Sequence, residues 1–313
     1  MRTVQVETLG GVIDVERGGV ATLGVFDGVH LGHQLLLRRL TEAARERSSR
    51  STVLTFAVHP VVVVRKLTPR LITSLPHRLR LFEGLGIDTC VVLPFDAAVR
   101  ELSADAFARS VFLDGLGASG LVLGPDTHVG RDRTGDLAFL RAFADGAGLS
   151  VEVVPALEDE GRKISSTRVR AAITDGDLVQ ASRMLGRPFS LLGTVVRGDG
   201  RGRKIGFATA NLDLHHEIRP PAGVYAIRAI HGGESSGGVL NIGIRPTFGP
   251  DGDLTVEAHL FDFDGDLYGQ DLEVVLLERL REEMRFGSRD ELARQIELDC
   301  AAARRALEDR NPT

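Results

Sequence analysis

The first half of the chain alternates short, continuous apolar runs with longer amphipathic stretches. The apolar runs are typical of buried strands, and the longer stretches carry apolar residues at helical spacing. This alternation constrains the fold most, because it predicts a doubly wound α/β domain, a parallel sheet with helices on both faces. The expected strands are VATLGVF (20–26), STVLTFAV (51–58), DTCVVLPF (88–95), GLVLG (120–124) and LSVEVVP (149–155). The expected helices are 33–46, 103–116 and 136–148.

The pattern changes near Gly186–Pro188, where strand-like runs joined by glycine-rich turns take over. Such a series predicts a small antiparallel β-barrel. We therefore expect two domains, 1–186 and 187–313. The barrel strands are expected at 191–196, 223–230, 237–244, 254–263 and 271–280. A final helix is expected over 288–309, because Ser288 and Glu291 match a capping box and precede an apolar stripe, Leu292, Ile296, Cys300, Ala303 and Leu307.

The net charge of −5 over 313 residues provides no general attraction for nucleic acid or for an anionic membrane. We find neither the pattern of a signal peptide nor an apolar run of membrane-spanning length, so we expect a cytoplasmic protein without a membrane partner. Cys90 and Cys300 lack metal-ligand spacing and are expected to be ordinary thiols. The sequence is compatible with a homo-oligomer and does not specify one.

The stretch GVFDGVHLGH (24–33) lies where a strand is expected to end and a helix to begin. Its glycines allow the backbone to approach a phosphate, and a helix N-terminus offers unpaired N–H groups. His30 and His33 add two imidazoles three residues apart. The alternative is a plain strand-to-helix turn with a surface histidine. A zinc site is less attractive, because no further Cys or His follows at ligand spacing.

A second stretch, KISSTRVR (163–170), places hydroxyls at an expected helix start and arginines one turn further on. Taken alone, it is either an anion-binding helix terminus or an ordinary helix cap with solvent-facing arginines.

Together the two stretches resemble the HxGH and ISSTxxR signatures of the nucleotidylyltransferase superfamily, in the spelling of FMN adenylyltransferases. The resemblance implies a Rossmann-like nucleotidylyltransferase domain that transfers an adenylyl group from ATP to FMN, giving FAD and pyrophosphate. It implies that His30 and His33 contact the ATP phosphates and stabilise charge in the transition state. The other nucleotide-binding residues implied are Gly24, Phe26, Asp27, Gly32, His59, Asp126, Ser165, Ser166, Thr167 and Arg170.

Two segments of this half depart from the family. FAVHP (56–60) stands where the family has Phe-Asp-Pro-His-Pro, so Ala57 and Val58 replace a carboxylate and a proline. GPDTHVG (124–130) stands where the family has Gly-x-Asp/Asn-Phe-x-Phe-Gly, so Thr127 and Val129 replace two phenylalanines. The phosphate motifs are intact, and the departures leave the acceptor and the nucleotide preference open.

The run 193–211 carries several glycines and basic residues between two strand-like segments. It is either a phosphate-binding flap or a solvated hairpin, and it lacks the Walker pattern. Together with GVLNIGIRPTFG (238–249) and the segment 256–286, it resembles riboflavin kinase along nearly the whole of 187–313. The resemblance implies a small barrel that transfers the ATP γ-phosphate to the ribityl 5′-hydroxyl of riboflavin.

The same resemblance implies roles for individual barrel residues. Thr209 and Asn211 would coordinate Mg²⁺ and an ATP phosphate, since hard oxygen ligands suit that ion. Glu257 would be the general base, although without the resemblance it is simply the polar member of an alternating strand. Ala208 stands where the family has proline. The remaining nucleotide- and flavin-binding residues implied are Gly198, Arg201, Lys204, Gly206, Arg285 and Phe286.

The leading hypothesis is a bifunctional enzyme of the bacterial riboflavin kinase/FMN adenylyltransferase type, the FAD synthetase family. Its substrates would be riboflavin, FMN and ATP, with Mg²⁺ as cofactor and with neither nucleic acid nor a membrane as partner. The first alternative is a riboflavin kinase whose N-terminal domain uses another acceptor or nucleotide, or only regulates. The second alternative is a flavin- or nucleotide-binding module without turnover.

Overall fold

The structure is a computed structural model, and the residues it describes are 1–10, 13–65, 70–198, 207–215, 218–245 and 253–309. The chain forms two compact units, Met1–Leu71 with Leu75–Ser166, and Ile72–Ser74 with Thr167–Thr313. Each unit has its own buried apolar core.

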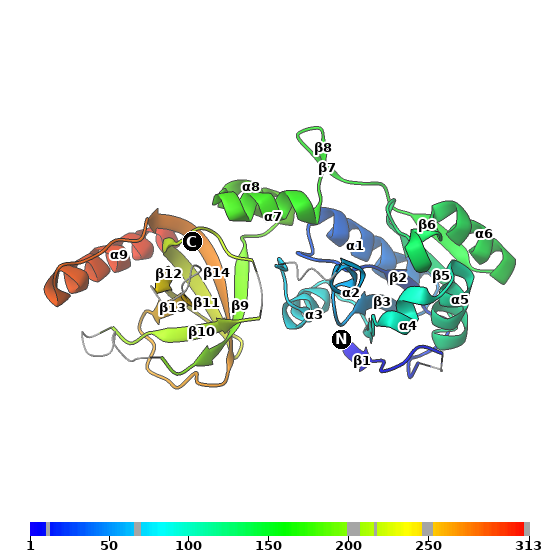
Figure 1. The fold of residues 1–313 in the computed structure, drawn as a ribbon, viewed down its shortest axis with the longest axis horizontal. Coiled ribbons are helices and arrows are strands. Elements are labelled where there is room, and N and C mark those ends of the chain that lie inside the picture. The colour runs from blue at the N-terminus through cyan, green and yellow to red at the C-terminus, as the bar shows by residue number, and fades with distance from the viewer. Residues whose placement is uncertain (11–12, 66–69, 199–206, 216–217, 246–252, 310–313) are drawn as a thin grey trace. The chain divides into compact units, whose positions relative to one another are not determined.

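The first unit contains a six-stranded sheet in the order β1-β4-β3-β2-β5-β6, in which every neighbouring pair is parallel (Figure 1). The central strands are completely buried and read as continuous apolar runs, as expected of a sheet covered on both faces. The strands are β1 (Arg2–Gln5), β2 (Val20–Leu23), β3 (Ser51–Phe56), β4 (Thr89–Leu93), β5 (Gly120–Leu123) and β6 (Ser150–Val153).

Helices cover both faces of this sheet. On one face α1 (Leu31–Glu46) and α3 (Leu75–Gly84) bury their apolar residues against alternate strand residues such as Val53 and Val92. On the other face α5 (Ala104–Ala108), the π-helical segment Arg109–Gly115 and α6 (Leu137–Ala147) pack on residues such as Leu54 and Leu93. The remaining short elements are α2 (Pro60–Arg65), α4 (Ala97–Glu101), the 3₁₀ turn Arg131–Arg133, β7 (Glu158–Asp159) and β8 (Arg162–Lys163).

The direction of winding reverses at β2, which has β3 on one side and β5 on the other. The chain first moves outward through β3 and β4, and then returns to place β5 and β6 beyond β2. In open α/β sheets, ligands bind at the carboxyl ends of the strands beside such a reversal. The residues that follow β2 are those of the stretch 24–33, so the topology places this stretch where a ligand site is expected.

The second unit contains α7 (Ser166–Asp175), α8 (Leu178–Leu185) and a closed antiparallel barrel in the order β10-β13-β12-β11-β14-β9. Gly186, with φ of 68°, is the C-cap that ends α8 before the barrel. The hairpin between β11 and β12 has only two loop residues, Gly232 and Gly233, both with positive φ, as a tight hairpin requires. The strands are β9 (Ser190–Val196), β10 (Ala210–Leu214), β11 (Gly223–His231), β12 (Glu234–Arg245), β13 (Asp253–Leu260) and β14 (Asp271–Arg281).

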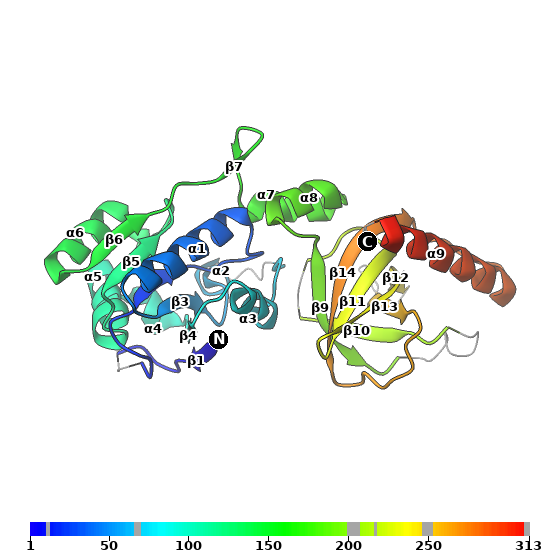
Figure 2. The ribbon, with the colours of Figure 1, turned by 180° about the vertical axis from the view of Figure 1, so that it is seen from behind.

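The last helix, α9 (Arg289–Asp309), packs against β11, β12 and β14 (Figure 2). Ala303 and Ala306 are its buried apolar contacts with the barrel. Its start is the expected capping box, since the Glu291 amide donates to the Ser288 hydroxyl at 3.2 Å and the Glu291 carboxylate accepts from the Gly287 amide at 2.8 Å.

The predicted fold class is confirmed, since an N-terminal parallel sheet with helices is followed by an antiparallel barrel and a C-terminal helix. The structure adds β1, β10 and the helices α2, α3 and α4, which the sequence patterns did not predict. β1 is largely exposed and β10 buries only Leu212, so neither strand has the apolar run that signals a strand.

Candidate functional site

The turn between β2 and α1 is held in an unusual backbone conformation. Phe26 and Val29 have positive φ angles of 54° and 42°, which bulky and β-branched residues rarely adopt. Both side chains are buried at 3% and 1% exposure, so core packing holds the strained backbone in place. A Cβ added at Gly24 would lie 2.9 Å from the Phe26 ring, which explains the glycine at the start of the turn.

The two histidines of this turn stack on each other. His30 is the N-cap of α1, and its Nδ1 accepts the backbone N–H of His33 at 3.3 Å. The ring centroids are 3.6 Å apart at 16°, and an added Cβ at Gly32 would lie 3.3 Å from the His30 ring. Because Nδ1 of His30 accepts this hydrogen bond, the proton of its neutral ring belongs on Nε2.

The pKa of His33 lies well below its ordinary value of 6.5. The largest cause is burial, and electrostatic interactions with His30, Arg78 and Lys163 act in the same direction. Its Nδ1 has no hydrogen-bond partner among the described residues. His33 is therefore a neutral imidazole at pH 7, with a ring nitrogen available for a ligand.

The second motif meets the first at its serine. The Ser166 hydroxyl donates to the backbone oxygen of Asp27 at 2.8 Å, across 139 residues of sequence. Asp27 itself is buried at 3% exposure. Ser165 immediately precedes α7, while Thr167 and Arg170 lie on α7 in the second compact unit.

Further predicted residues lie at the same carboxyl edge of the sheet. Asp126 follows β5, the neighbour of β2, and its carboxylate forms an ion pair with Lys163 of the second motif. His59 follows β3, the other neighbour, and its Nδ1 accepts the Val61 amide at 3.1 Å, capping α2. The turn that follows β2, residues 24–33, is called the glycine-histidine turn. This turn, Asp126 with Lys163, and His59 therefore all lie at the carboxyl ends of neighbouring strands.

In the barrel, the predicted general base and a predicted metal ligand are cross-strand partners. Asn211 of β10 lies directly opposite Glu257 of β13, which in turn lies opposite Asn241 of β12. Residues directly opposite each other share a face of the sheet, so the two amides flank the carboxylate on one face. Thr209 lies one residue before β10.

These residues fit Mg²⁺ by the chemistry of their donor atoms. A threonine hydroxyl, an asparagine amide oxygen and a carboxylate are the hard oxygen ligands that this ion takes, usually together with substrate phosphates and water. Within the described ranges, His, Cys, Asp and Glu form no group of three or more that could hold a metal ion.

The predicted phosphate flap, within residues 193–211, contacts the side chain of Asn211 at Gly198. A Cβ added at Gly198 would lie 2.2 Å from the Asn211 amide nitrogen, so the backbone there packs directly on the Asn211 side chain. The other flap residues, Arg201, Lys204 and Gly206, lie outside the described residues.

The segment between β14 and α9 carries Arg285 and Phe286. The guanidinium of Arg281 lies 5.8 Å from the centre of the Phe286 ring and binds the carboxylate of buried Asp299 at 2.7 Å. A Cβ added at Gly243 would lie 2.7 Å from the Glu283 carboxylate and 3.3 Å from the Asn241 amide. The segment therefore approaches the barrel face that carries Glu257.

Models of two protein families match the chain. The FAD synthetase model matches residues 12–168 and the riboflavin kinase model matches residues 185–307. A bifunctional riboflavin kinase/FMN adenylyltransferase of Pseudomonas fluorescens is 42% identical over 288 residues, 92% of this chain and 93% of that protein. Proteins of the same name from Escherichia coli K12 and Bacillus subtilis are 38% and 37% identical, and the matches cover 92% and 96% of this chain and 93% and 96% of theirs.

This chain belongs to the bifunctional riboflavin kinase/FMN adenylyltransferase family. The family predicted from the sequence is thereby confirmed. A crystal structure from Streptococcus pneumoniae, named as a macrolide-efflux protein, is similar over 97% of this chain and 99% of its own, with a TM-score of 0.83 and 32% identity. Among the described residues of this family member, no helix is long and apolar enough to cross a membrane.

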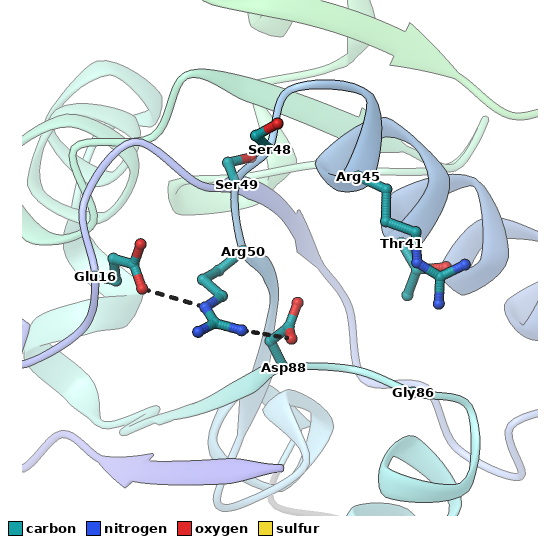
Figure 3. A pocket seen from close by; sticks show the side chains of 8 residues that line it. All are labelled: Glu16, Thr41, Arg45, Ser48, Ser49, Arg50, Gly86 and Asp88. Carbon is teal, nitrogen blue, oxygen red and sulfur yellow. Dashed lines mark hydrogen bonds and ion pairs between the residues drawn. The ribbon is translucent and has the colours of Figure 1, made fainter.

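This member of the family also has a polar concavity at the other end of its sheet, before β3 and β4 (Figure 3). Its volume is about 440 Å³. Arg50 lies between Glu16 and Asp88, with N–O distances of 3.2 and 3.3 Å. These charges already neutralise one another, and the concavity lies away from the family motifs.

Sequence reasoning overlooked two residues that contact the motifs of this family. Arg78 of α3 donates to the Val25 carbonyl in the glycine-histidine turn. His259 of β13 bonds the Ala208 carbonyl at 2.8 Å, immediately before Thr209. The sequence contained a sign of each residue's role. Arg78 is spaced with Leu75, Leu79 and Phe82 on the core-facing side of a helix. His259 is two residues from Glu257 and therefore lies on the same face of the strand.

Proposed function

We propose that the chain performs both reactions of its family. Residues 187–313 would transfer the γ-phosphate of ATP to the 5′-hydroxyl of riboflavin, giving FMN and ADP. Residues 1–186 would join FMN to the adenylyl group of a second ATP, giving FAD and pyrophosphate. The observation that carries the proposal is the presence in one chain of two intact clusters, the histidine pair with Ser166 and the Asn211–Glu257 pair. We place the enzyme in the cytoplasm, with small molecules as its partners.

Adenylyl transfer needs charge stabilisation more than covalent chemistry. A phosphate oxygen of FMN attacks the α-phosphorus of ATP, and the bond to the bridging oxygen breaks as pyrophosphate leaves. His30 and His33 would donate ring N–H groups to the phosphate oxygens as charge accumulates there. The N-terminus of α1 adds its backbone N–H groups, and Ser165, Ser166, Thr167 and Arg170 would hold the triphosphate.

Gly24, Phe26, Asp27, Gly32, His59 and Asp126 would shape the nucleotide pocket. Among them, Phe26 packs on the His33 ring at 5.3 Å between centroids, with the rings nearly perpendicular. That contact fixes the orientation of His33, which supports the pre-organisation that phosphate binding requires.

Riboflavin phosphorylation begins with a weak nucleophile, a primary hydroxyl. Glu257 would accept the hydroxyl proton as its oxygen attacks the γ-phosphorus and ADP leaves. Mg²⁺ would be held by Thr209, Asn211 and the ATP phosphates and would neutralise their charge. Arg285 and Phe286 would contact the flavin ring, and Gly198, Arg201, Lys204 and Gly206 would bind the phosphates.

One observation favours a second candidate, in which the N-terminal domain has a changed acceptor. Val58 is 45% exposed, so an apolar side chain faces solvent where the family has proline. Thr127 is turned onto its own loop, where its hydroxyl accepts the Gly124 amide at 3.1 Å. Val129, in contrast, is 4% exposed and lies in the core, so its difference from the family alters packing.

The test is to incubate the purified protein with riboflavin, ATP and Mg²⁺ and to separate the flavins by chromatography. We expect FMN first and FAD afterwards. If FMN accumulates and no FAD forms even when FMN and excess ATP are supplied, the first proposal is wrong and the second candidate stands. Replacing ATP by CTP or GTP then shows whether the nucleotide has changed.

A further inference from the structure

A buried arginine lies beneath the glycine-histidine turn. Arg78 of α3 is only 2% exposed, on the helix face that otherwise carries apolar residues such as Phe82. Removing a guanidinium from water costs free energy, which its contacts in the folded chain must recover. The partners of this buried charge lie outside α3, in the turn after β2 and on β3. We therefore look for the role of Arg78 at that neighbouring site.

The contacts of Arg78 join the turn to the sheet. Its Nη1 donates to the backbone oxygen of Val25 and, at 3.1 Å, to the hydroxyl of Thr55 on β3. Val25 directly precedes Phe26, where the backbone enters its positive-φ conformation. One guanidinium nitrogen therefore ties the strained turn to the neighbouring strand. The Nε of Arg78 has no hydrogen-bond partner among the described residues.

The charge of Arg78 acts on the site as well. Burial lowers the pKa of Arg78, and Asp27 opposes that shift. A guanidinium nevertheless keeps its proton in proteins. The groups that face His33 are His30 of the same turn, Arg78 of α3 and Lys163 of β8, and all three lower its pKa. Arg78 is the buried cation among them, whereas the Lys163 side chain is exposed.

We propose that Arg78 is a positioning residue for adenylyl transfer, which holds the Val25 carbonyl and thereby fixes the turn that presents His30 and His33 to the ATP phosphates. This inference rests on the proposed function of the N-terminal domain. The charge of Arg78 also favours the neutral form of His33, so that the stacked rings do not repel each other as two cations.

The test compares two variants that separate the charge from the hydrogen bond. Arg78→Lys keeps the charge and a donor, whereas Arg78→Gln keeps a donor and loses the charge. We expect Arg78→Gln to lower kcat for FAD formation about tenfold, with a smaller change in KM for ATP, because the turn and its field are disturbed while the nucleotide still binds. Arg78→Lys should keep at least about a third of the rate. Riboflavin phosphorylation in the same samples should stay unchanged, and hydrogen exchange of the α1 amides reports whether the first unit is folded.

A second readout is independent of turnover. The ring resonances of His33, assigned with His33→Gln, are titrated by NMR. In the wild type the pKa of His33 should lie below the ordinary histidine range. In Arg78→Gln this pKa should rise, because a positive charge is lost, and in Arg78→Lys it should stay in place. An arginine that only packs against the sheet, without its charge acting on His33, would leave the titration unmoved in both variants.

The outcomes separate the two claims. A wild-type chain that forms no FAD overturns the proposed function. Wild-type FAD formation and an unmoved His33 titration in Arg78→Gln overturn the role of Arg78 alone. If the α1 amides of Arg78→Gln lose their protection, so that its first unit is unfolded, Arg78→Lys decides. A folded Lys variant with less than about a tenth of the rate, or with a shifted His33 titration, contradicts the inference.

Discussion

The stacked histidines show what single residues contribute to this molecule. Two imidazoles whose centres lie 3.6 Å apart repel each other if both are protonated, and Arg78 and Lys163 add further positive charge. The sequence showed both histidines and their spacing. It did not show that His33 is held neutral, because the causes are burial and a positive charge on α3 that is distant in sequence.

His33 makes the stability of the first unit depend on pH. Its pKa is lower in the folded chain than in the unfolded one, so the unfolded chain binds the extra proton as the pH falls below about 6.5. Its contribution to stability is complete above that pH and is lost toward acid, with a slope of up to about 1.4 kcal/mol per pH unit. Hydrogen exchange of the α1 amides at about pH 7.5 and about pH 5.5 measures the effect. The loss should be smaller in His33→Gln, and an equal loss in both proteins contradicts the assignment.

We expect His259 to assist the kinase reaction by holding the backbone of Phe207 and Ala208, the two residues before Thr209. Its Nδ1 bonds the Ala208 carbonyl at 2.8 Å and its ring meets Phe207 edge-on at 5.4 Å. We expect His259→Ala to lower kcat of the kinase about tenfold and to leave FAD formation from added FMN unchanged. Ala208→Pro in the same chain should restore part of the rate, because proline fixes the backbone that His259 otherwise restrains. Steady-state kinetics of the single and double variants checks this, and a double variant no better than His259→Ala counts against it.

At the scale of elements, apolar runs predicted most of the strands, but not which residues of distant strands pair with one another. The glycines and histidines of the sequence predicted the turn after β2. They did not predict the positive φ of Val29, because β-branched residues rarely adopt a positive φ. Asn211 and Glu257 were singled out separately. Their direct cross-strand pairing depends on the register of β10 and β13, which a sequence with a single buried residue in β10 does not specify.

The contact between Gly198 and Asn211 predicts a specific effect on the kinase. In Gly198→Ala the new Cβ would overlap the Asn211 amide, at 2.2 Å, and force that side chain away from its place beside Glu257. We expect kcat of the kinase to fall about tenfold, with FAD formation from FMN unchanged.

Gly232→Ala is the matched control for this variant. Its Cβ meets nothing within 4 Å, and only its φ of 55° makes alanine unfavourable. It should cost about 1 kcal/mol of barrel stability and leave the kinase rate intact. Thermal unfolding and kinase rates of both variants distinguish the effects. Equal kinase rates in Gly198→Ala and Gly232→Ala would show that the Asn211 contact is irrelevant.

At the scale of the whole molecule, one chain carries two compact units with separate apolar cores. The family models divide the chain in the same order, with FAD synthetase first and riboflavin kinase second. The order of reactions is the reverse, because the C-terminal domain would make the FMN that the N-terminal domain uses. Each predicted motif set lies within one predicted domain, 1–186 or 187–313, whereas the residues Thr167 and Arg170 of the first set fall in the second compact unit.

The central claim is that each domain performs one reaction with its own residues. The most direct test measures both half-reactions, riboflavin to FMN and added FMN to FAD, in His30→Ala and in Glu257→Gln. We predict that His30→Ala makes FMN at the wild-type rate and loses FAD formation by about a hundredfold or more, and that Glu257→Gln shows the reverse. If either variant lost both half-reactions while remaining folded, or kept both, the division of labour between the two domains would be contradicted.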